Sequence, residues 1–170
     1  GSGTITLGNA TLSDGVTLTL GTGGSGAINA AAVTGTAGNA ASNLTINTTG
    51  VATVAGAVGT DIGTLTVTNS NGATFASSVS ADTVAITDTA DGKTLAFQND
   101  LTVTTGMTVA NTANAYNVSI TGASNSIAIS GNTMVFGNTG SLTLGNSSSD
   151  GFTFGSSSNL GAIIATAPSQ

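Results

Sequence analysis

One short strand pattern, in which apolar and small polar side chains alternate, returns five times along this chain at nearly even intervals. The copies begin at Leu44, Leu65, Val84, Leu101 and Val118, so the steps between their first residues are 21, 19, 17 and 17. Self-similarity at about this period is typical of solenoid proteins, in which each repeat forms one turn of a coil. The pattern predicts an all-β fold, a parallel β-helix (β-solenoid) with turns of about 17 to 21 residues.

Alternation within each copy separates inward from outward side chains. If the first and third residues face inward, they form two apolar columns in which neighbouring side chains lie about 4.8 Å apart. The second and fourth residues then face outward. They form two surface rows, Thr45, Thr66, Ala85, Thr102 and Ser119 in one and Asn47, Thr68, Thr87, Thr104 and Thr121 in the other.

Threonine is common on exposed strands, so a structural role explains both rows. Parallel rows of threonine on a flat face are also the arrangement that ice-binding proteins present to an ice lattice. Ice binding is therefore an alternative function for this surface.

Shorter alternating segments lie between the copies at a spacing of about ten residues, which indicates two or three strands per turn. Turn residues separate them, as in Asn69-Ser70-Asn71-Gly72. Residues 21–41 alternate less regularly, and the glycine-rich stretch Gly21 to Gly26 predicts a loop. We expect one solenoid domain over residues 1–170, of about seven to nine turns, with its less regular turns at 21–41.

Titratable side chains are scarce. The chain has no His and no Cys, all seven acidic residues are Asp, and Lys93 is the one cationic side chain. General acid-base catalysis usually recruits His, Glu or Lys with a tuned pKa, so we expect no enzyme and no catalytic residues.

The formal net charge of −6 makes a nucleic-acid partner unexpected, because Lys and Arg supply most of the affinity for phosphates. Anionic membrane surfaces are disfavoured for the same reason. No apolar run approaches the roughly 20 residues needed to span a bilayer, so the sequence predicts no transmembrane segment.

Calcium is the one ion that the sequence suggests. Asp88 and Asp91 bring two carboxylates to one turn, with Asp82 and Asp100 nearby, and Ca²⁺ prefers clustered oxygen ligands. The spacing matches neither an EF-hand loop nor the nonapeptide of calcium-binding β-rolls. Asp also caps turns and keeps a surface soluble, so a structural role is the alternative.

A ligand-binding adhesin is a further alternative. Surfaces that bind glycans usually offer exposed aromatic side chains. The five Phe residues alternate like core residues, and Tyr116 is left as the one candidate aromatic contact.

Several segments resemble the degenerate repeats of very large bacterial surface proteins, namely autotransporter passengers and filamentous-haemagglutinin-like adhesins. The segments are Ala57 to Val67, Gly72 to Phe75 and Asn138 to Asn146. The resemblance concerns the general character and the period of the repeats, and it covers most of the chain. It implies a right-handed parallel β-helix outside the cell, used as a stalk, adhesin, matrix fibre or surface layer.

Neither end of the chain shows a charged or helical cap, although a free-standing solenoid needs its terminal strands covered. We therefore expect a segment or subunit of a larger array, whose partners are copies of itself or neighbouring repeats. The expected function is structural: part of an extracellular fibre, biofilm-matrix filament or adhesin stalk that stacks end to end. A surface-layer protein or an adhesin with a surface or glycan ligand is the alternative.

Overall fold

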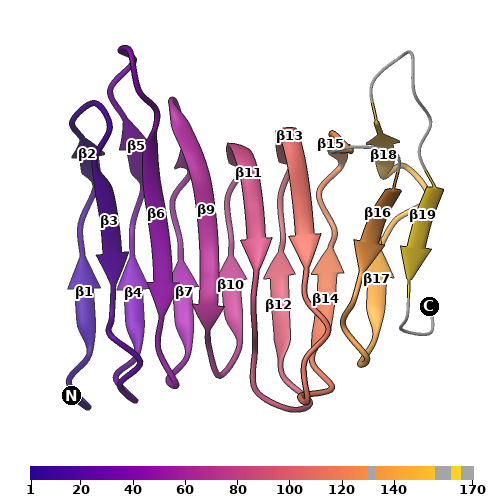
Figure 1. Cartoon of the computed structure of the whole chain (residues 1–170), viewed down its shortest axis with the longest axis horizontal. Helices are drawn as coiled ribbons and strands as arrows, with labels where there is room; N and C mark the ends of the chain where they lie inside the picture. The colour runs from indigo at the N-terminus through magenta and orange to yellow at the C-terminus, as the bar shows by residue number, and fades with distance from the viewer. Residues whose placement is uncertain (130–132, 156–161, 166–170) are drawn as a thin grey trace.

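Strands alone form the regular structure of the described chain. The computed structural model describes residues 1–129, 133–155 and 162–165, and every regular element in them is a β-strand. All strand pairs are parallel, and the chain winds in stacked coils of about 23 residues per turn, about 6 turns in all. Figure 1 shows the coils side by side along one axis, with the N-terminus at one end and β17 and β19 near the other. The predicted β-solenoid is confirmed, but its turns are longer than the 17 to 21 residues expected and fewer than the seven to nine expected.

Each turn carries three strands, which build three faces. Face A is a seven-stranded sheet whose successive strands lie one turn apart, so that its seven strands span the six turns. Its strands are β1 (Ile5–Leu7), β4 (Ile28–Ala30), β7 (Ala52–Val54), β10 (Ala73–Phe75), β12 (Thr94–Phe97), β14 (Asn117–Ile120) and β17 (Leu142–Leu144).

Faces B and C hold the second and third strands of each turn and are joined into one twelve-stranded sheet, because β11 (Val79–Ile86) and β13 (Leu101–Val109) run through both. The other strands of face B are β2 (Ala10–Leu12), β5 (Val33–Gly35), β8 (Val58–Gly59), β15 (Ser124–Ile127) and β18 (Gly151–Phe154). The other strands of face C are β3 (Thr17–Leu20), β6 (Ser42–Asn47), β9 (Ile62–Asn69), β16 (Thr133–Phe136) and β19 (Ala162–Ala165).

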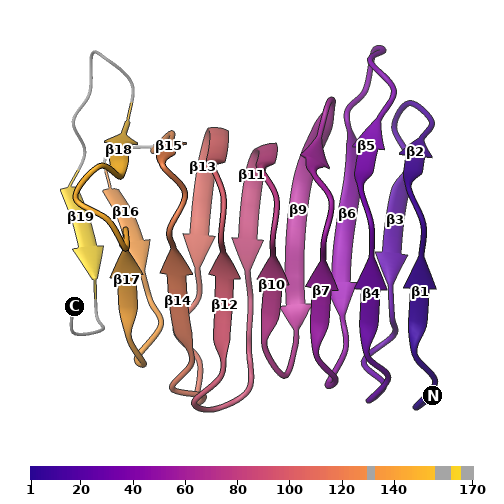
Figure 2. The ribbon, with the colours of Figure 1, turned by 180° about the vertical axis from the view of Figure 1, so that it is seen from behind.

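The coil is right-handed, as the resemblance implied. In Figure 1 the strands of face A lie behind and run upward, the strands of face C lie in front and run downward, and the chain advances from left to right. Figure 2, from behind, brings face A to the front. Parallel strand crossovers are nearly always of this hand, because right-twisted strands return to their sheet only that way.

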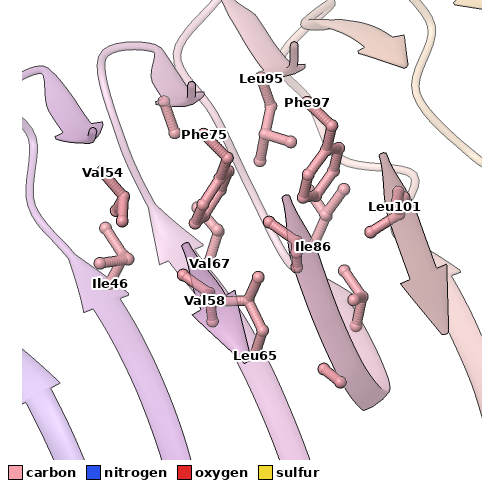
Figure 3. Close-up of a cluster of buried hydrophobic side chains, with 14 of the residues drawn as sticks. Ile46, Val54, Val58, Leu65, Val67, Phe75, Ile86, Leu95, Phe97 and Leu101 are labelled. Carbon is pink, nitrogen blue, oxygen red and sulfur yellow. The ribbon is translucent and has the colours of Figure 1, made fainter. Parts of the chain in front are cut away.

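The interior of the coil is filled by apolar side chains at alternate positions of each strand. In β6 the buried positions are Ser42, Leu44 and Ile46, with half-exposed residues between them. Figure 3 shows the inward side chains of neighbouring coils packed in a row along the axis. The rings of Phe75 and Phe97 stack with their centroids 5.0 Å apart and their planes 12° apart. Because each coil covers the apolar surface of the next, burial is shared along the whole axis.

The predicted columns are correct for three coils and wrong for the last two. Leu44, Leu65 and Val84 stack on face C, but the next residue in their column is Met107. Leu101 instead lies on face B beside Val79. Val118 lies on face A, where it pairs with Leu95. The same alternating pattern occurs on strands of all three faces. The five copies that the sequence predicts as one column therefore lie on three different faces.

The strands within the stretch 21–41 are paired on both sides in the parallel ladder, as the strands of neighbouring coils are. Strand β4 pairs with β1 and β7, and β5 pairs with β2 and β8. Its irregular appearance comes from the long connections on both sides of these short strands. One of them begins at Gly21, whose φ of 82° is favourable for glycine alone.

A charge placed inside the coil tests the assigned register. Val67→Lys should lower the free energy of unfolding by more than about 4 kcal/mol or prevent folding, because it buries an unpaired charge. Thr66→Lys, one residue earlier and directed outward, should change it by no more than about 0.5 kcal/mol. Urea denaturation followed by circular dichroism measures both. Equal effects of the two substitutions would show that the assigned register is wrong.

Candidate functional site

Most outward positions of the three faces carry small, uncharged side chains, and the exposed Val135 of β16 is an apolar exception on face C. Face C presents two adjacent columns, and faces A and B present one each. The columns of face C are Thr17, Asn43, Thr64, Thr83 and Gly106, and Thr19, Thr45, Thr66, Ala85 and Thr108. The column of face A is Thr6, Asn29, Thr53, Thr74, Ala96, Ser119 and Thr143.

The two threonine rows expected from the sequence do not form as predicted. Thr45 and Thr66 are neighbours on face C, but Thr102 lies on face B between Ser80 and Ser126. Thr104 lies at the bend within β13, where its Oγ1 donates a hydrogen bond of 2.7 Å to Asp82 Oδ1.

The second predicted row is divided among strand ends. Asn47 pairs with Asn69, and a register shift next to this pair leaves Thr68 as the additional residue of β9. Thr87 and Thr121 follow the last residues of β11 and β14, at two different corners of the coil. The ice-binding alternative therefore concerns the two columns of face C, and it stays a prediction.

The charged side chains lie at the corners between faces and at one bend. Asp82 lies at the bend inside β11, where the ladder shifts register between Ala81 and Thr83. The others lie in connections between strands: Asp14, Asp61, Asp88, Asp91, Lys93, Asp100 and Asp150. The flat faces are thus uncharged.

Asp88 makes the densest polar cluster, at the C-to-A corner, which we define as the connection from each face C strand to the next face A strand. Its Oδ1 accepts hydrogen bonds from the Thr89 N–H at 2.9 Å and from Thr112 Oγ1 at 2.9 Å. Asn114 Nδ2 donates to both carboxylate oxygens, at 3.2 and 2.9 Å. Thr112 and Asn114 belong to the following coil. The carboxylate therefore ties one C-to-A corner to the next.

Asp91 acts on the same pair of corners, because its Oδ1 accepts the Ala115 N–H at 2.9 Å. Hydrogen bonds of the same kind join other neighbouring coils, and the sequence pattern did not predict them. Asp100 Oδ1 accepts from the Ser124 N–H at 2.9 Å, and Asn117 Oδ1 accepts from the Ser141 N–H at 2.7 Å. In each case the acceptor lies 24 residues before the donor, which is one turn. That spacing becomes a recognisable signal only once the length of the turn is known.

A column of buried hydroxyl groups lies at the C-to-A corner. Thr48 Oγ1 donates toward the Gly24 and Gly26 carbonyl oxygens, at 2.8 and 2.6 Å. In the following coils the Ser70 and Thr89 hydroxyl groups bond to each other at 3.0 Å. These hydroxyl groups are buried but have partners, so the corner is a hydrogen-bonded structure.

Tyr116 is fully buried and is not the exposed ligand contact that the sequence left open. Its hydroxyl donates a 2.6 Å hydrogen bond to the Ala110 carbonyl oxygen. Burial, and secondarily the negative charge of Asp88, raises the pKa of Tyr116 from 10.0 to about 12. Gly140 of the next coil lies against the Tyr116 carbonyl, where a Cβ atom would clash with backbone.

The phenylalanine side chains are also part of the interior. Phe75, Phe97 and Phe136 are buried, and Phe152 and Phe154 pack half-buried against the core. None of the aromatic side chains in the described residues is exposed.

Asp88 and Asp91 lie on one corner, as the calcium hypothesis requires, but their oxygens accept hydrogen bonds from the following coil. Over residues 1–129, 133–155 and 162–165, no three His, Cys, Asp or Glu side chains are grouped so that they could hold a metal ion. Calcium binding by Asp88 and Asp91 stays a prediction. The same part of the chain contains no helix long and apolar enough to cross a membrane.

Neither a protein-family model, nor a curated protein, nor a solved structure compared with this chain matches it.

The buried Tyr116 hydroxyl predicts a pH dependence of stability. Because the pKa is higher in the folded chain than in the unfolded chain, the stabilisation is complete below pH 10 and is lost as pH rises toward about 12. Tyr116 is the one Tyr and there is no Trp, so the near-ultraviolet absorbance of tyrosinate reports this group alone. We expect a midpoint near 12 in the folded protein and near 10 in denaturant. Tyr116→Phe should remove this part of the pH dependence. A midpoint near 10 in the folded protein would contradict the burial.

Removing the carboxylate of Asp88 tests the bond between corners. Asp88→Ala leaves the Thr89 N–H and the side chains of Thr112 and Asn114 without their acceptor, so the free energy of unfolding should fall by about 1 to 3 kcal/mol. Asp91→Ala, at an exposed residue with one such bond, should cost less. Urea denaturation measures both effects, and an equal or larger loss for Asp91→Ala would contradict this account.

The same two variants test calcium. If Asp88 and Asp91 bind the ion, calcium should raise the denaturation midpoint of the natural sequence, and both variants should lose that increase. A midpoint unaffected by calcium or by chelator would leave the carboxylates with the structural role alone.

Proposed function

We propose that this chain is a structural segment of an extracellular bacterial fibre, such as a biofilm-matrix filament or an adhesin stalk. Its role is mechanical: the parallel ladder forms a stiff rod, and further coils extend the ladder beyond both ends. The partners are copies of the chain or neighbouring repeats of a longer protein. We propose no catalytic activity and no nucleic-acid partner.

The observation that carries this proposal is the uninterrupted ladder along one axis. Seven strands of face A pair successively, and each contributes inward side chains to the same apolar columns. Such a rod can be long and stiff without depending on any single residue, since each coil contacts only its neighbours.

The surface supports a structural role. The flat faces carry mostly Thr, Ser, Asn, Ala and Gly, with the exposed Val135 of β16 as an apolar exception on face C, and the described aromatic side chains are buried or half-buried. An adhesin that bound glycans through aromatic side chains would need them exposed. An extracellular location is supported by the resemblance to bacterial surface repeats and by the single Lys93, which leaves one target for a trypsin-like protease.

Immunogold electron microscopy of intact source cells tests the location and the form of the protein together. Antibody raised against the purified chain should label filaments or stalks on unpermeabilised cells, and mild surface proteolysis with a broad-specificity protease should remove the label. An antibody against a cytoplasmic protein is the control for intact cells. Labelling that appears only after permeabilisation would overturn the proposal.

A further inference from the structure

The ladder of face C is interrupted between β13 and β16, which Figure 1 shows as neighbours in the front layer. Four pairs of residues join β9 to β11, and four join the face C part of β11 to β13. Between the described residues of β13 and β16 a single pair remains, Val109 with Phe136. The two strands therefore separate on the amino-terminal side of this pair.

The separation leaves backbone groups of β13 facing the gap. The Val109 carbonyl accepts the Gly137 N–H at 2.9 Å, so Val109 directs its backbone groups toward the following coil. Every second residue of a strand faces the same neighbour, so the N–H and C=O of Met107 also point that way. No described residue of β16 pairs with Met107 in the ladder. A ligand in the gap would supply hydrogen-bond partners that the ladder does not.

A pocket of about 460 Å³ lies at this separation. Small-molecule sites typically have volumes of about 300 to 1,000 Å³, are mainly apolar and contain a few polar groups. The described lining of this pocket has the same character. Met107, Val109, Met134 and Val135 supply apolar surface, and three threonines lie among them.

Both methionines of the chain line this pocket. Met107 and Met134 each lie two residues before the paired Val109 and Phe136, so they occupy the same inward position in successive coils. Methionine is unbranched and flexible, and it adapts to irregular apolar space at binding surfaces. The earlier coils carry stiffer, branched side chains at this position, namely Leu18, Leu44, Leu65 and Val84. The change to methionine therefore coincides with the pocket.

The charges around the pocket favour an uncharged ligand. None of the described lining residues is charged, and Asp82 directly precedes the lining residue Thr83. The one cationic side chain, Lys93, lies in the connection before β12 of face A. An anion would therefore enter an apolar site without a cation to pair with it, and the loss of its hydration would be costly.

The shape of the gap favours a small molecule over an added peptide strand. A strand inserted between two others needs about 4.8 Å on each side. Because β13 and β16 still pair at Val109 and Phe136, they do not leave that space along their whole length.

We propose that the pocket between β13 and β16 binds a small, uncharged, mainly apolar molecule that carries one hydrogen-bonding group. The apolar part of the ligand lies between the side chains of Met107 and Met134, and its polar group bonds to the Met107 backbone. This site is additional to the structural function proposed above and does not depend on it.

The methionine methyl groups report on this site alone, because both methionines line it. The full chain, labelled with ¹³C at these methyl groups, is titrated with N-phenyl-1-naphthylamine, an uncharged aromatic amine whose fluorescence rises in apolar surroundings. We expect both methyl signals in the NMR spectrum to shift to saturation, with the dissociation constant that fluorescence gives. Methyl signals that do not move, with or without a rise in fluorescence, would overturn the proposal.

A charged analogue of the same probe tests the class of ligand. 8-Anilinonaphthalene-1-sulfonate has the same aromatic rings and carries an added sulfonate. We expect it to bind on the order of tenfold more weakly than N-phenyl-1-naphthylamine, because no described lining residue neutralises its charge. Equal or tighter binding of the sulfonate would contradict an uncharged ligand.

Two matched variants test the location. Val135 lines the pocket and Val51 does not, and their side chains are similarly exposed, at 43% and 49%. Val135→Glu should weaken binding of N-phenyl-1-naphthylamine on the order of tenfold, because it places a charge beside the apolar ligand. Val51→Glu should leave binding unchanged. Both positions are exposed, so both variants should retain the circular dichroism of the natural sequence. Equal effects of the two substitutions on binding would place the probe elsewhere and overturn the proposal.

Discussion

Backbone hydrogen bonds between successive coils are the interaction on which this structure depends. Each strand of an inner coil is bonded to the coil before it and the coil after it, as β7 is to β4 and β10. This parallel pairing fixes the spacing of the coils. It also aligns equivalent side chains in columns, so a residue that faces inward in one coil covers an inward residue of the next. A chain with a net charge of −6 and few aromatic residues therefore builds a continuous apolar interior from Leu, Ile, Val and Ala.

The corners place different demands on the chain from the faces. On a face, the ladder satisfies the backbone and the outward side chain is free to be small and uncharged. At a corner the strand ends, and backbone N–H groups need other acceptors. Asp and Asn meet this need at several corners, as Asp100 does for Ser124 and Asn117 does for Ser141. Most of the Asp side chains lie at corners, where they accept hydrogen bonds from such backbone N–H groups, and the faces remain neutral.

Both ends of the solenoid follow from the same ladder. A strand in the middle of the sheet has both of its edges paired, whereas β1 and β17 have one edge each without a partner among the described residues. The half-buried Leu7 and Leu144 show that apolar surface accompanies these open edges.

The sequence by itself determined that the chain is an all-β coil and which side of each strand faces inward. Both properties follow from an alternation of period two, which is local and can be read within four residues, as in Leu44 to Asn47. The location of most strands was predictable for the same reason. The tertiary structure alone decided which strands stack. Leu101 and Val118 carry the same pattern as Leu44 but lie on faces B and A, because corner length, and not strand sequence, sets the position of a strand on the turn. It also brought Asp88 to Thr112 and Asn114, and Tyr116 into the interior, because these contacts join residues whose proximity depends on the 23-residue turn.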